Sequence, residues 1–183
     1  MDTPYIIVIA GPNGVGKSTF AKWYLRQRPA CKMIVDPDAI AKELNIPDEA
    51  QRNIAAGRIA LETIDANIRN GISFAIETTL SGKTLAAKLE QAHNAGYSIE
   101  ICLLQIPSVE ISTQRVVERV NAGGHNIPAD AQLRRFERSY RNFHDIYIEV
   151  CHEWSIYDAD TNPPELKSTG RGGFSTKRVV VRA

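Results

Sequence analysis

The chain has 183 residues and a formal net charge of +1, with 43% hydrophobic and 23% charged residues. That length supports one substantial core but is short for two independent domains, so we expect a single domain over residues 1–183. The composition is ordinary for a globular protein and excludes extensive disorder. Because the charge is close to zero, nothing global marks a nucleic-acid or membrane binder, and any basic site must be local.

The cysteines and the first apolar run argue against a zinc protein, a disulfide-rich protein and a membrane-spanning segment. Cys31, Cys102 and Cys151 are odd in number and show no C-x-x-C spacing, so neither a zinc site nor a disulfide framework is indicated. The run YIIVIA at residues 5–10 is too short to span a bilayer and lacks the flanks of a signal peptide. We therefore expect a buried strand there, a cytoplasmic protein and no membrane partner.

Apolar runs bounded by glycine, proline or aspartate predict five strands that are covered on both faces. They lie at residues 5–10, 32–35, 72–76, 97–106 and 154–157. Helical spacing predicts helices at residues 16–29, 47–70 and 82–95. Since strands alternate with helices, we predict an α/β fold with a five-stranded parallel sheet and helices on both faces.

After the fourth strand the alternation stops, because two predicted helices follow one another around the turn AGGHNIP at residues 122–128. The second helix has an apolar stripe and an arginine-bearing face. The stripe is Leu133, Phe136, Tyr140, Phe143, Tyr147 and Val150, and the arginines are Arg134, Arg138 and Arg141. Helix, flexible turn and helix together predict a lid over residues 108–141 that brings guanidiniums onto phosphates.

The tail at residues 162–183 is rich in proline, glycine, serine and basic residues. We expect it to be partly loose. Its segment KRVVVR at residues 177–182 is interpreted as an edge strand, with a polyanion contact as the alternative.

The segment GPNGVGKST directly after the first strand matches the phosphate-binding loop pattern G-x-x-x-x-G-K-[ST]. Its glycines let backbone N–H groups wrap phosphate oxygens, and the following helix N-terminus adds favourable partial charge. Lys17 would reach the outer phosphates, Ser18 would hold Mg²⁺ and Thr19 would be a neighbouring phosphate contact. The predicted nucleotide-binding residues are Gly11, Pro12, Asn13, Gly14, Val15, Gly16, Lys17, Ser18 and Thr19.

The strand ends indicate what the chain does with its nucleotide. There is no guanine-reading N-K-x-D and no apolar strand that ends in consecutive acids, which argues against a switch GTPase and against a motor or AAA-type ATPase. Instead, VDPDAI and FAIETTLSGK end the second and third strands, at the edge of a parallel sheet where ligands bind. The side chains expected there are Asp36, Asp38, Glu77, Thr78 and Thr79.

Phosphoryl transfer to a hydroxyl needs a carboxylate close to the acceptor, and Asp38 is the candidate general base. The alternative is that Asp38 only caps a helix beginning at Ala39, with Asp36 and Pro37 making the turn. Glu77 is expected to contact the substrate or a water on Mg²⁺, the alternative being a buried acid paired with a backbone group.

Arginines would neutralise the transferring phosphoryl group when the lid closes. Arg115 and Arg119 lie on one side of the first lid helix, and Arg134 and Arg138 lie on the second. The alternative is a solvated face that pairs with nearby glutamates. His125, in the turn, is either a donor to phosphate or substrate or simply a turn residue.

This combination of segments resembles the zeta-toxin family of P-loop kinases over nearly the whole chain. It comprises GPNGVGKST, VDPDAI, IETTLSGK and an arginine-bearing lid before the final strand. The resemblance implies a three-layer P-loop NTPase fold with a helical arginine lid. It also implies that Lys17 binds phosphate, that Asp38 is the general base and that Arg115 is the first lid arginine. Glu77 and Thr79 would lie near the acceptor.

Zeta toxins phosphorylate UDP-N-acetylamino sugars with ATP or GTP, so the resemblance implies these nucleotides with Mg²⁺, a small-molecule hydroxyl acceptor and an antitoxin partner. The toxins carry a second lid arginine where this chain has GGHNIP, so either His125 replaces it or Arg134, Arg135 or Arg138 supplies the charge. Two other functions stay open. One is a polynucleotide or tRNA kinase, although the net charge does not favour a nucleic-acid partner, and the other is a nucleotide-dependent regulatory module with a protein partner.

Overall fold

The structure, a computed structural model, describes residues 3–31, 33–121 and 129–176. Its middle layer is a six-stranded sheet in the order β2-β3-β1-β4-β5-β6. The strands are β1 (Tyr5–Ala10), β2 (Ile34–Val35), β3 (Phe74–Thr78), β4 (Ser98–Gln105), β5 (Glu153–Asp158) and β6 (Glu165–Arg171). Strands β1 to β5 are parallel, and β6 runs antiparallel to β5. The predicted α/β fold is confirmed, but the sheet has six strands rather than five.

The first part of the tail forms a sixth strand, which the sequence pattern did not predict. Residues Glu165–Arg171 pair with β5 at the edge of the sheet, and a short helix α7 (Gly173–Thr176) follows. Most side chains of β6 are exposed, so no apolar run marks this strand in the sequence. The segment KRVVVR at residues 177–182 lies outside the described residues.

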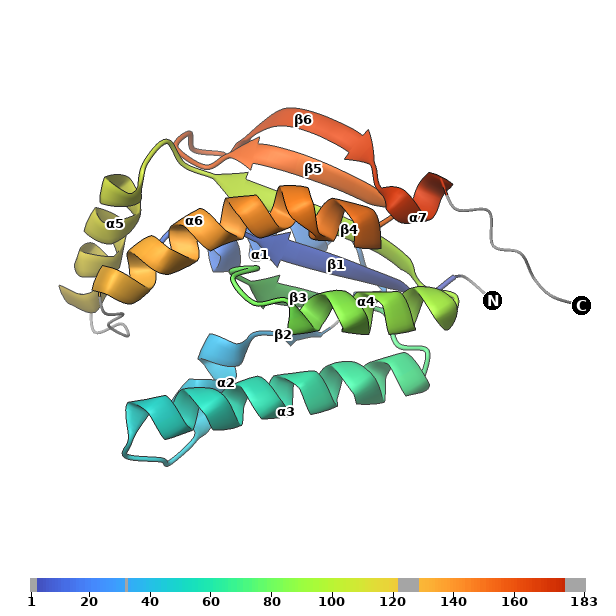
Figure 1. Cartoon of the computed structure of the whole chain (residues 1–183), viewed down its shortest axis with the longest axis horizontal. Helices are drawn as coiled ribbons and strands as arrows, with labels where there is room; N and C mark the ends of the chain where they lie inside the picture. The colour runs from blue at the N-terminus through green and yellow to red at the C-terminus, as the bar shows by residue number, and fades with distance from the viewer. Residues whose placement is uncertain (1–2, 32, 122–128, 177–183) are drawn as a thin grey trace, which may run out of the picture.

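Helices cover both faces of the sheet (Figure 1). They are α1 (Lys17–Tyr24), α2 (Pro37–Glu43), α3 (Glu49–Arg69), α4 (Thr84–Asn94), α5 (Val109–Asn121) and α6 (Ala129–Asp145), with 3-10 turns η1 (Leu25–Gln27) and η2 (Tyr147–Val150). Residues of α3, α4 and α6 share one core cluster with one face of the sheet, and residues of α1 share another cluster with the opposite face. The described residues thus form three layers, as predicted.

Strand β1 lies at the centre of this arrangement. Side chains from Ile6 to Ile9 alternate between the two core clusters and are 0–1% exposed. Burying each of them contributes about 1.5–3 kcal/mol relative to leaving it in water. This burial on both faces explains the continuous apolar run and fixes the position of the loop that follows β1.

Helix α5 and the first turns of α6 lie at the carboxyl ends of the strands, and the rest of α6 covers the sheet (Figure 1). The predicted apolar stripe is buried at Phe143, Tyr147 and Val150, the last two of which belong to η2. Leu133, by contrast, is 48% exposed, because the first turns of α6 extend past the sheet. Among the described residues, no helix is long and apolar enough to cross a membrane.

Candidate active site

The glycine-rich loop connects the end of β1 to the start of α1. Gly14 and Gly16 have φ angles of 72° and 96°, which favour glycine. A Cβ at Gly14 would also lie 2.7 Å from the carbonyl oxygen of Ser112 in α5. The N-cap of α1, Gly16, contributes no side-chain hydrogen bond, so the first N–H groups of the helix have no side-chain cap. Such a helix start favours a bound phosphate.

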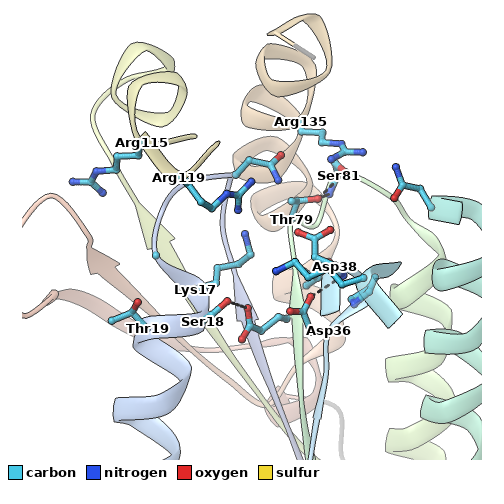
Figure 2. A pocket seen from close by; sticks show the side chains of 18 of the residues that line it. Lys17, Ser18, Thr19, Asp36, Asp38, Thr79, Ser81, Arg115, Arg119 and Arg135 are labelled. Atoms are coloured by element: carbon cyan, nitrogen blue, oxygen red, sulfur yellow. Dashed lines mark hydrogen bonds between the residues drawn. The ribbon is translucent and has the colours of Figure 1, made fainter. Parts of the chain in front are cut away.

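Lys17 lies at the centre of the cavity (Figure 2). Its Nζ donates to the carbonyl oxygens of Gly11 and Pro12, both at 3.0 Å. Burial lowers the pKa of Lys17, while the carboxylates of Asp38 and Glu77 act in the opposite direction. A phosphate group would add further negative charge near this ammonium and favour its charged form.

Ser18, in the first turn of α1, and Glu77, near the end of β3, form a hydrogen-bonded pair. The Oγ of Ser18 donates to Oε2 of Glu77 at 2.8 Å, since β3 lies directly beside β1 and pairs Glu77 with Ile9. Burial raises the pKa of Glu77, while the hydrogen bond from Ser18 lowers it and the charge of Asp36 raises it. Glu77 is buried, as the alternative expected, but its partner is the side chain of Ser18 and not a backbone group.

This pair provides the kind of oxygen ligands that suit Mg²⁺. Magnesium is typically held by one or two protein oxygens together with substrate phosphates and waters. The described residues contain no cluster of three or more His, Cys, Asp or Glu side chains arranged to hold a metal. Ser18 and Glu77, beside the phosphate loop, would instead supply two protein oxygens to a Mg²⁺ that is also held by substrate phosphates and waters.

In the segment after β2, the residue that caps the next helix is Asp36 and not Asp38. Asp36 is the N-cap of α2, its Oδ1 accepts the backbone N–H of Asp38 at 2.9 Å, and Pro37 occupies the first turn. Burial raises the pKa of Asp36, while this backbone hydrogen bond lowers it. The interpretation of Asp38 as the cap is therefore wrong, because the neighbouring aspartate takes that role. The carboxylate of Asp38 is exposed and lines the cavity.

One cavity of about 470 Å³ brings most of the predicted site residues together. The predicted residues that line it are Asn13, Gly14, Gly16, Lys17, Ser18, Thr19, Asp36, Asp38, Glu77, Thr78, Thr79, Arg115 and Arg119. Arg135, one of the candidates for the second lid charge, also lines the cavity, and so do Pro37, Lys42, Glu49, Asn53 and Ser81. No sequence motif predicts Lys42, Glu49 and Asn53 at the cavity, because their position depends on how α2 and α3 pack.

The lid arginines divide into two groups. Arg119 and Arg135 point toward the cavity, whereas Arg115 points away from Lys17 (Figure 2). The charge of Arg119 is one of the causes that lower the pKa of Lys17, so this guanidinium lies close to the phosphate site. Arg115 donates instead to the carbonyl oxygen of Ala159 at 2.9 Å and to Asp160 Oδ1 at 3.0 Å, in the loop after β5.

The structure does not bring Arg134 or Arg138 to the cavity. Arg134 is exposed and lies 3.9 Å from Asp130, one turn earlier on α6, while Arg138 is exposed and is not part of the lining. Successive helical residues point about 100° apart, so Arg135 lines the cavity where its neighbour does not. His125 lies outside the described residues.

The fold and this loop define a P-loop nucleotide-binding protein with a kinase-like architecture. Residues 6–145 match the family described as the AAA domain, and the chain belongs to this family. No strand of the described residues ends in the paired acids that would indicate a motor or AAA-type ATPase. At the end of β3 the structure has a single acid, Glu77, which is followed by Thr78.

Comparison with known proteins finds a relative in sequence and similar folds among solved structures. An uncharacterized protein from Haemophilus influenzae is 32% identical over 130 residues, which are 71% of this chain and 91% of that protein. The structure of the PezAT chromosomal toxin–antitoxin system of Streptococcus pneumoniae matches with a TM-score of 0.71 and 17% identity, over 92% of this chain and 72% of that chain. Shikimate kinase from Acinetobacter baumannii, in complex with shikimate, matches with a TM-score of 0.53 and 15% identity, over 95% and 88%. The predicted resemblance to zeta-toxin-like P-loop kinases is confirmed in the fold.

Proposed function

We propose that the protein is a kinase that transfers the γ-phosphoryl group of ATP, or of GTP, to a hydroxyl group of a small molecule. One observation carries the proposal. The carboxylate of Asp38, which does not cap α2, lines the same cavity as Lys17 and the Ser18–Glu77 pair. A base beside a phosphate site is what an alcohol acceptor requires.

In this mechanism the acceptor hydroxyl attacks the γ-phosphorus in line with the leaving oxygen. Asp38 accepts the hydroxyl proton while the new O–P bond forms and the bond to the β-phosphate oxygen breaks. Backbone N–H groups of the loop and Lys17 hold the phosphates, and Arg119 and Arg135 neutralise charge from the lid side. Ser18 and Glu77 would hold Mg²⁺, which neutralises charge on the phosphates when it is bound.

The first acceptor class to test is the UDP-N-acetylamino sugars. The zeta-toxin resemblance supports this class, and the cavity has cationic side chains for a phosphorylated compound in Lys42, Arg119 and Arg135. The likeness to the PezAT toxin–antitoxin system supports a protein partner of the antitoxin type.

The test is acceptor-dependent formation of ADP, measured with ATP and Mg²⁺ over a panel of compounds. The panel contains UDP-N-acetylamino sugars, other small hydroxyl compounds and short RNA, with Lys17→Ala as the blank. Stimulation by a small hydroxyl compound would support the proposal. Stimulation by RNA alone, with a steep dependence on salt, would replace it with a polynucleotide kinase.

A further inference from the structure

A second cavity, which we call the annex, adjoins the active-site cavity. It has a volume of about 170 Å³. Three residues at the ends of β2 and β3 line both cavities: Pro37, Glu77 and Thr78. Pro37 directly precedes Asp38, and no residue of the glycine-rich loop lines the annex. The annex therefore meets the active site at the ends of β2 and β3, beside Glu77 and one residue from Asp38, and not at the glycine-rich loop.

The walls of the annex are mainly apolar. They come from β2, β3, α3 and α4, and include Val35, Ala60, Leu61, Ile64, Ile76 and Leu85. The hydroxyl of Tyr147, which also lines the annex, already donates to the carbonyl oxygen of Gly82 at 2.8 Å. The other polar side chains of the lining are Thr84 and the shared Glu77 and Thr78, so the apolar wall from β2, α3 and α4 is the part of the annex that favours an apolar group.

Two glycines keep the annex open although neither backbone nor packing requires them. Gly57 lies within helix α3 and Gly82 precedes α4, and a Cβ at either position would meet no atom within 4 Å. Neither residue has a positive φ. Alanine at position 57 would fit the space and would favour the helix. A glycine inside a helix where alanine would fit departs from helix propensity, and such departures without a structural reason are typical of functional sites.

We propose that the annex receives an apolar group of the acceptor substrate, such as one aromatic ring or a branched alkyl group, and thereby places the acceptor hydroxyl beside Asp38. The proposal rests on the kinase function proposed above. The size is suitable, since a dry apolar cavity of about 150 Å³ binds benzene. The methyl of an N-acetyl group would fill only part of the annex, so within the acceptor panel we expect compounds that carry a larger apolar group to bind more tightly.

The test measures binding of benzyl alcohol to the full chain by saturation-transfer NMR in the presence of ADP and Mg²⁺. We expect saturable binding to the wild type and a dissociation constant about tenfold or more higher in Gly57→Leu, because the new side chain fills the annex. Gly57→Ala should lie between the two. Arg58→Ala, an exposed neighbour on the same helix, is the matched control and should bind benzyl alcohol like the wild type. Unchanged ADP affinity in all variants shows that each one is folded.

An equal dissociation constant in the wild type and in Gly57→Leu would overturn the proposal, as would the lack of saturable binding to the wild type. Failure of the kinase function has a different signature. In that case no compound of the acceptor panel becomes phosphorylated, although benzyl alcohol binds to the wild type and Gly57→Leu blocks it.

Discussion

At the scale of single residues, the two aspartates at the end of β2 divide two roles between them. Asp36 caps α2 and carries a pKa raised by burial, whereas Asp38 presents an exposed carboxylate to the cavity. In the D-x-D motif Asp36 therefore caps the helix, and the carboxylate of Asp38 remains available to a ligand in the cavity. The capping aspartate and the proposed general base are thus two different carboxylates.

Replacing Asp38 by Asn removes the proposed base and keeps the size of the side chain. We expect nucleotide affinity to stay near the wild-type value and turnover to fall about 10²–10⁴-fold, the usual contribution of a positioned base. Calorimetric titration with ADP and steady-state kinetics measure the two quantities. Asp145→Asn, which changes an exposed carboxylate at the end of α6, is the control. Full turnover in Asp38→Asn would remove Asp38 from the mechanism.

Glu77 is expected to reduce the stability of the nucleotide-free protein. It is 5% exposed, and burial raises its pKa above the ordinary value of 4.5. At a pH below the unfolded-state pKa the carboxyl is protonated in both the folded and the unfolded state, so it does not lower the free energy of unfolding. As the pH rises through the higher pKa of the folded state, the buried charge lowers the free energy of unfolding.

We therefore expect Glu77→Gln to melt at a higher temperature than the wild type at pH near 7, and the difference to vanish below about pH 4. Calorimetric melting over this pH range, without nucleotide, checks it. Turnover should fall, because the partner of Ser18 has lost its charge. A wild type that is more stable than Glu77→Gln at neutral pH would contradict this reading of Glu77.

At the scale of elements, the lid helix α5 carries two arginines with different surroundings. Arg119 points toward the cavity (Figure 2), whereas Arg115 is held by Ala159 and Asp160. We expect Arg119→Ala to lower turnover about 10²–10³-fold, as loss of one charge-stabilising donor does. Arg115→Ala should have the smaller effect on turnover. Steady-state kinetics of the two variants measure this difference. A larger loss of turnover in Arg115→Ala would mean that Arg115, and not Arg119, neutralises the transferring phosphoryl group.

Helix α3 contains a glycine whose replacement should stabilise the fold. Gly57→Ala should raise the free energy of unfolding by about 0.5–1 kcal/mol, since alanine loses less backbone entropy in a helix. Gly71→Ala is the contrasting variant. Its position is equally open but has a φ of 66°, so alanine there should destabilise. Urea unfolding followed by circular dichroism measures both, and a destabilised Gly57→Ala would mean that the residue is needed for packing.

The elements also show which parts of the fold could be predicted. Strands β1 and β4 are buried on both faces and therefore have continuous apolar runs that mark them. Strand β6 is an exposed edge strand, and its residues have no such pattern. The N-cap of α2 is Asp36, two residues before Asp38, the residue of the capping alternative. The sequence could not settle this, because either aspartate of D-x-D can cap a helix and only the backbone geometry decides.

At the scale of the whole molecule, the near-neutral chain concentrates its chemistry at one edge of the sheet. The glycine-rich loop and the two strand-end motifs could be predicted there, because parallel strands bring their carboxyl ends together. Lys42, Asn53 and the annex could not, since they depend on how α2 and α3 pack against β3. The choice of Arg135 over Arg134 depends on the rotation of α6, which sequence spacing alone leaves open.

The central claim is that the γ-phosphoryl group goes to a hydroxyl acceptor and not to water. The most direct measurement is the fate of labelled γ-phosphate from ATP, separated into inorganic phosphate and phosphate ester, with Mg²⁺ and the acceptor panel. We predict labelled ester in the wild type and none in Lys17→Ala. Label found only in inorganic phosphate would indicate an ATPase and contradict the account, and tight ATP binding with no release of label would indicate a regulatory module instead.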